Sequence, residues 1–90
     1  MLFMYIHTHT VENCMAGKPQ ELEKITSEVL DAFKKSGIKI LGAYAAPNEH
    51  TGFRIIEAND LAALQRALMP MTKWGTSRLI PVTVNEAWTK

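Results

Sequence analysis

Apolar and polar residues alternate along four stretches of the chain, and a period of two is typical of β-strands. The pattern predicts strands over 2–10, 38–46, 51–58 and 77–84. In the first of these strands the side chains divide into two sets, one of Leu2, Met4, Ile6 and Thr8 and the other of Phe3, Tyr5, His7 and His9. Both sets are largely apolar, so we expect a central strand that is covered on both faces.

The period becomes helical over 19–36, where apolar residues recur at intervals of three and four positions. These residues are Leu22, Ile25, Val29, Ala32 and Phe33. Pro19 stands at the first helical position, which tolerates proline, and Gly37 supplies the end. A second helix begins after a cap at Asn59 or Asp60 and ends or bends at Pro70. Its apolar stripe is Leu61, Leu64 and Leu68.

The resulting order of strands and helices, βαββαβ, is that of the ferredoxin-like α+β fold. That fold is a four-stranded antiparallel sheet with two helices on one face, and 90 residues make a single domain spanning 1–90. We expect Phe3 and Tyr5 on the sheet face that the helices leave uncovered. A homodimer whose sheets pack face to face as a barrel would bury that face.

Charge and composition narrow the classes of partner. Ten basic and nine acidic residues are mixed along the chain, with a net charge of +1, so no basic block indicates nucleic acid or an anionic membrane. A single cysteine excludes an intrachain disulfide. No leader pattern and no run near the roughly 20 apolar residues of a membrane span are present, so we expect a cytoplasmic protein.

Four segments carry a resemblance to a known group of proteins: residues 1–4, 40–44, 52–60 and 80–82. The chain resembles an uncharacterised prokaryotic family of small domains in the dimeric α/β-barrel superfamily. That superfamily includes antibiotic-biosynthesis monooxygenases, muconolactone isomerases and stress-responsive barrel proteins. The resemblance implies the fold and the homodimer, but it carries over no catalytic residue. In the commoner form of that family we expect an aromatic residue where this chain has one of its first two histidines.

All three histidines and the only cysteine fall where this topology brings strand ends together. His7 and His9 close the first strand and point to one side, Cys14 follows in the loop, and His50 precedes the third strand. Imidazole and thiolate ligands favour zinc, copper or iron over magnesium or calcium. The sequence therefore predicts a transition-metal site of His7, His9 and Cys14, completed by His50 or Glu49.

Two other interpretations use the same residues differently. In the first, a cofactor-independent enzyme of the isomerase or monooxygenase type acts on a small organic molecule in the barrel. His7 would then serve as acid or base, and Tyr44 or Arg78 would orient the substrate. In the second, the protein is a non-catalytic dimeric interaction module, and the histidines and the thiol only pack. The sequence indicates a site and names no reaction.

Overall fold

The computed structural model describes residues 1–14 and 17–89, so the middle of the expected 11–18 loop and the last residue of the chain lie outside the described residues. The strands are β1 (Leu2–His9), β2 (Lys39–Ala46), β3 (Thr51–Glu57) and β4 (Gly75–Val82). The α-helices are α1 (Pro19–Lys35) and α2 (Leu61–Leu68), and short 3₁₀ helices are η2 (Pro47–Glu49), η3 (Met69–Lys73) and η4 (Glu86–Trp88). The predicted order of strands and α-helices is confirmed.

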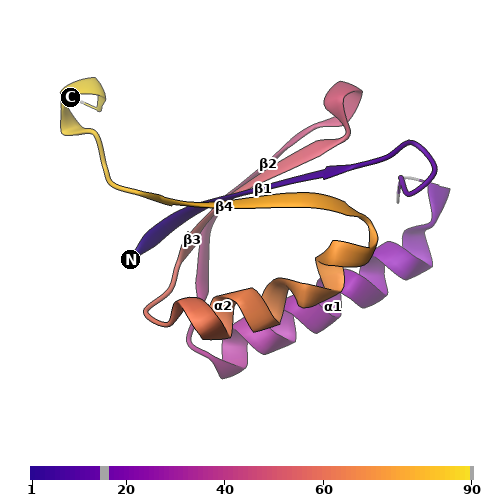
Figure 1. Ribbon diagram of the computed structural model, residues 1–90, viewed down its shortest axis with the longest axis horizontal. Helices are drawn as coiled ribbons and strands as arrows, with labels where there is room; N and C mark the ends of the chain where they lie inside the picture. The colour runs from indigo at the N-terminus through magenta and orange to yellow at the C-terminus, as the bar shows by residue number, and fades with distance from the viewer. Residues whose placement is uncertain (15–16, 90) are drawn as a thin grey trace.

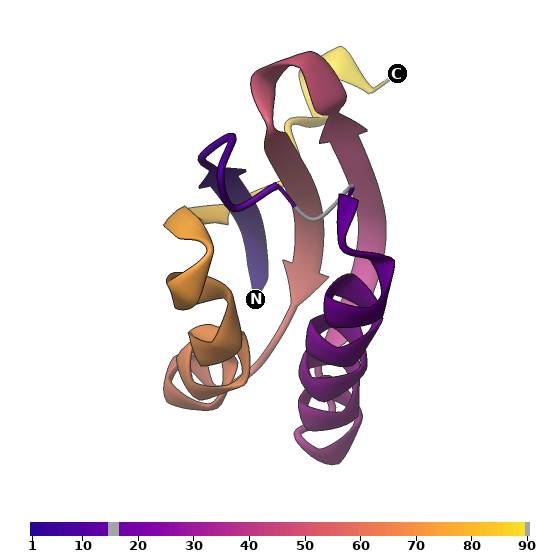
Figure 2. The ribbon, with the colours of Figure 1, turned by 90° about the vertical axis from the view of Figure 1, so that its right-hand side faces the viewer.

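The strands form one antiparallel sheet in the order β2-β3-β1-β4. Both α-helices lie on the same face of this sheet, as a second layer (Figure 1). Figure 2 shows α1 on the side of the molecule where β2 lies, and α2 on the opposite side, where β1 and β4 lie. This is the predicted ferredoxin-like arrangement, with one face of the sheet uncovered.

Local signals set the helix ends much as expected. Pro19 starts α1, and Gly37, with a φ of 67°, follows its end in the left-handed region that glycine adopts freely. The Asp60 carboxylate accepts a hydrogen bond of 3.2 Å from the backbone N–H of Ala63, so Asp60 is the cap of α2. The chain tightens into η3 just before Pro70, because proline has no N–H to continue an α-helix.

The β4 strand begins at Gly75 instead of the predicted Ser77. Gly75 pairs with His9, and Thr76 pairs with Thr8. Gly75 and Thr76 show no alternation of apolar and polar residues that would predict a strand. They belong to β4 because they pair with β1.

The core lies between the sheet and the helices, and it contains Phe3 and Tyr5, which are 1% and 2% exposed. The expectation that these two residues lie on the uncovered face is therefore wrong. Phe3, Tyr5 and His7 turn toward the helices, so Leu2, Met4 and Ile6 lie on the opposite face. The other core residues are Val29, Phe33, Ile38, Ile56, Ala58, Leu64, Ala67 and Leu68.

The predicted helix stripes are buried only in part. Val29 and Phe33 of α1 and Leu64 and Leu68 of α2 are in the core, but Leu22, nearer the start of α1, is 46% exposed. Leu22 lines a cavity between α1 and the sheet. Among the described residues, no helix is both long and apolar enough to cross a bilayer.

Candidate metal centre

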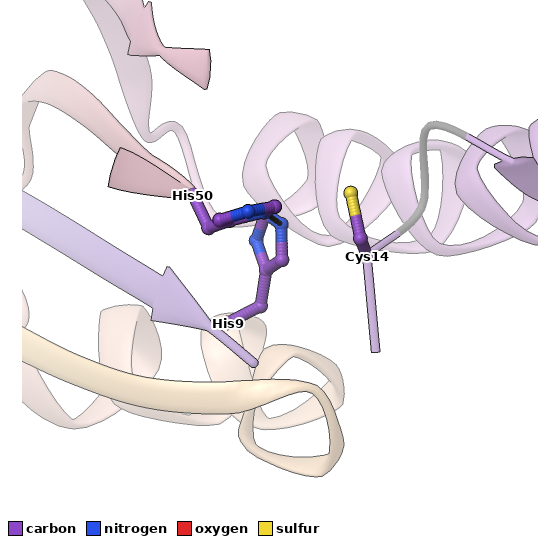
Figure 3. A group of neighbouring side chains, drawn as sticks. All are labelled: His9, Cys14 and His50. Carbon is purple, nitrogen blue, oxygen red and sulfur yellow. Dashed lines mark hydrogen bonds between the residues drawn. The ribbon is translucent and has the colours of Figure 1, made fainter. Parts of the chain in front are cut away.

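Two histidines meet where β1 ends and β3 begins. The backbone N–H of His9 donates to the carbonyl of His50 at 3.0 Å, so the two residues are tied through the main chain. Their side chains also meet, with His50 Nδ1 and His9 Nε2 3.3 Å apart and the rings nearly perpendicular at 82° (Figure 3). One nitrogen donates and the other accepts, so a single proton lies between the rings, and a metal ion bound by both nitrogens would displace this proton.

His50 adopts an uncommon backbone conformation at this point. Its φ is 49°, in the left-handed region, and its N–H donates to the Pro47 carbonyl at 3.1 Å. This conformation costs an L-residue about 1–2 kcal/mol, although histidine adopts it more often than most residues. The short η2 helix therefore ends in a sharp bend from which the His50 ring points at His9 (Figure 3).

Cys14 comes to the histidines from the loop that leaves β1. Its N–H donates to the Val11 carbonyl at 3.2 Å, which folds the loop into a turn. The sulfur of Cys14 and one nitrogen each of His9 and His50 all lie within 4.8 Å of one another, and the three residues are partly buried (Figure 3). Metal–nitrogen bonds of about 2.0–2.1 Å at a tetrahedral angle place two nitrogens about 3.3 Å apart. The spacing of the two imidazoles has this value.

His7 lies on the same strand face but outside this group. Its Nε2 is 3.0 Å from the carbonyl oxygen of Met71. A carbonyl only accepts, so Nε2 carries the proton and is not available as a metal ligand. The His7 ring is 6.3 Å from the His9 ring and only 4% of the residue is exposed. The structure thus brings together His9, Cys14 and His50, with His7 deeper along β1.

Burial controls the ionisation of the histidines on β1. It lowers the pKa of His7, against the hydrogen bond to Met71, and the charges of His9 and Arg54 lower that pKa further. Burial also lowers the pKa of His9, and the charge of His50 adds to the effect. Both imidazoles are therefore mainly neutral at pH 7, and the neutral imidazole is the form that binds a metal.

Tyr44 and Arg78 lie on the other face of the sheet. Tyr44 is paired with Phe53, and both Phe53 and Arg78 are paired with Ile6, so they form one row across the uncovered face. Tyr44 is 67% exposed. The structure therefore does not place Tyr44 or Arg78 in the same site as His7.

A cavity of about 500 Å³ lies between α1 and the sheet and includes the three metal-ligand candidates in its wall. Sequence reasoning missed Arg54, which also lines this cavity, because a lone arginine in a strand is typical of a solvated position. The sequence signal for Arg54 was its position two residues before the apolar Ile56, because residues two apart on a strand point to the same face of the sheet. Trp74 lines the cavity as well. Its buried indole N–H has no acceptor within residues 1–14 and 17–89, and the Lys18 ammonium lies 5.9 Å from its ring.

Comparison with known proteins gives a family but no activity. A family model described as a domain of unknown function, DUF3303, matches residues 1–90. The crystal structure of SCO4226 from Streptomyces coelicolor A3(2) is similar, with a TM-score of 0.58, 19% sequence identity, and coverage of 93% of this chain and 100% of that one. At this identity the likeness shows the fold alone. A search of curated proteins found no match.

Proposed function

The chain belongs to DUF3303, a family of domains of unknown function, and from its site we propose that it binds a transition-metal ion. The ligands are His9, Cys14 and His50. One observation carries the proposal: side chains from three separate segments present two nitrogens and a sulfur within 4.8 Å of one another.

The donor set narrows the choice of metal. Imidazole and thiolate ligands suit zinc, copper and iron. Three protein ligands leave one position of a tetrahedral ion open, which is typical of catalytic zinc sites, whereas structural sites use four. The open position can accept water or a small ligand, because the three side chains also line the cavity.

Removal of a ligand is expected to abolish metal binding while the fold persists. Chelator-treated protein is titrated with Zn²⁺ and, as a spectroscopic probe, Co²⁺. We expect one ion per chain and a thiolate-to-cobalt charge-transfer band. His9→Ala should weaken binding about 100-fold or more, since loss of even an outer hydrogen-bond partner of a ligand costs 10–100-fold. Cys14→Ser should also remove the charge-transfer band.

His7→Gln is the matched control for these variants. The glutamine amide can still donate to the Met71 carbonyl, and His7 is not one of the proposed ligands. We expect metal affinity within a few-fold of wild type. Equal losses in His7→Gln and His9→Ala would contradict the assigned ligand set, and no binding of zinc, copper or iron by the wild-type protein would overturn the proposal.

We also propose that the chain forms a homodimer through the uncovered face of its sheet. Apolar side chains from β1, β3 and β4 lie on that face and remain partly exposed in the single chain: Leu2, Met4, Ile6, Phe53, Ile55, Ile80 and Val82. A continuous apolar surface of this kind is typical of an interface. A second copy, with its own uncovered face, offers a matching apolar surface.

Met4→Glu is expected to convert this dimer into a folded monomer. Met4 is paired with Ile55 on one side and Ile80 on the other, so a carboxylate there would be buried without a partner in the interface. Sedimentation velocity measures the mass, and Ala62→Glu on the exposed side of α2 is the control. An undisturbed dimer in Met4→Glu would place the interface elsewhere.

A further inference from the structure

The wall that α1 contributes to the cavity is apolar except for Thr26. Its apolar residues are Leu22, Ile25, Val29, Leu30 and Phe33. A volume of about 500 Å³ is within the range of small-molecule sites. Such a wall holds the apolar part of a ligand by removing it from water.

Arg54 contributes the only permanently charged side chain among the described residues that line this cavity. It is paired with Tyr5 on the helix-covered face and is partly buried. Its Nη1 is 3.0 Å from the position that a Cβ atom on Gly52 would occupy, so the guanidinium lies across that glycine. Gly52 is paired with His7, so the charge extends along the cavity toward the histidines.

Within the described part of the chain this guanidinium has no hydrogen-bond partner. None of the side-chain hydrogen bonds involves Arg54, and no aspartate or glutamate lines the cavity with it. Its N–H groups remain open to solvent in the cavity, since Trp74 Nε1 is the one buried side-chain nitrogen or oxygen without a partner among the described residues, and they are therefore free to donate to a ligand. The fork of N–H donors on a guanidinium matches the two oxygens of a carboxylate.

From this geometry we infer that the cavity binds a small monocarboxylate with an apolar chain, whose carboxylate is held by Arg54. The apolar chain lies along the α1 wall. This inference goes beyond the proposed metal site, because a carboxylate on Arg54 needs no metal ion.

Isothermal titration of the full chain with octanoate tests the inference. The protein is first treated with chelator, so the result is independent of whether the metal site exists. 1-Octanol serves as the uncharged ligand of equal chain length. We expect octanoate to bind at least tenfold more tightly than octanol. Arg54→Gln should weaken octanoate binding about 10- to 100-fold, as expected for loss of charged hydrogen bonds, and leave octanol binding unchanged.

Two further variants keep the test valid if Arg54→Gln disturbs the fold. Arg54→Lys retains the charge but loses the fork, so it should retain part of the affinity for octanoate. Gly52→Ala puts a methyl group against Nη1 and should weaken octanoate binding by less than Arg54→Gln does. The inference is overturned if wild type does not bind octanoate, if octanoate and octanol bind equally, or if folded Arg54 variants bind octanoate like wild type.

Discussion

Gly75→Ala is expected to destabilise the protein by about 3 kcal/mol or more and to disrupt the histidine site at the same time. A Cβ atom at Gly75 would lie 2.0 Å from the Thr8 carbonyl oxygen and 2.7 Å from the His9 Cα. Both are backbone atoms of β1, so no side-chain rotation can relieve the overlap. The strands β4 and β1 would have to separate at His9, one of the proposed metal ligands.

Denaturant unfolding of Gly75→Ala, together with the zinc titration, measures both effects. Gly17→Ala is the control, because a Cβ at Gly17 has no atom within 4 Å among the described residues. We expect Gly17→Ala to stay within about 0.5 kcal/mol of wild type. Equal stability of the two alanine variants would contradict the close approach of the β4 backbone to the β1 backbone at Gly75.

Phe3→Glu is expected to abolish the native fold, with a loss of about 4 kcal/mol or more in the free energy of unfolding. Phe3 is 1% exposed and lies in the core beside Ile56, its partner on β3. The substitution removes a buried aromatic ring and places a carboxylate there without a partner.

The adjacent Met4→Glu makes this a test of which face of β1 is covered. Met4 points to the uncovered face, so Met4→Glu should keep the circular dichroism spectrum of a folded chain even where it dissociates the proposed dimer. Phe3→Glu should lose that spectrum. The reverse outcome, with Phe3→Glu folded and Met4→Glu unfolded, would contradict the assignment of the faces.

The sequence alone determined the order of strands and helices and most of their bounds. Its signals are local: Pro19 begins α1, Gly37 follows its end, and an acidic cap precedes α2. It also determined that His9 and His50 would come together, because the topology places the end of β1 beside the start of β3.

Only the tertiary structure decided which face of the sheet the helices cover. Both alternate sets of β1 are apolar, so the period of two groups Phe3 with Tyr5 without showing which side they face. The packing of distant segments also separated His7, which is bonded to Met71, from the group of His9, Cys14 and His50, and it turned Arg54 toward the cavity. A residue's position along a strand follows from local sequence, whereas its face and its neighbours depend on the packing of distant segments.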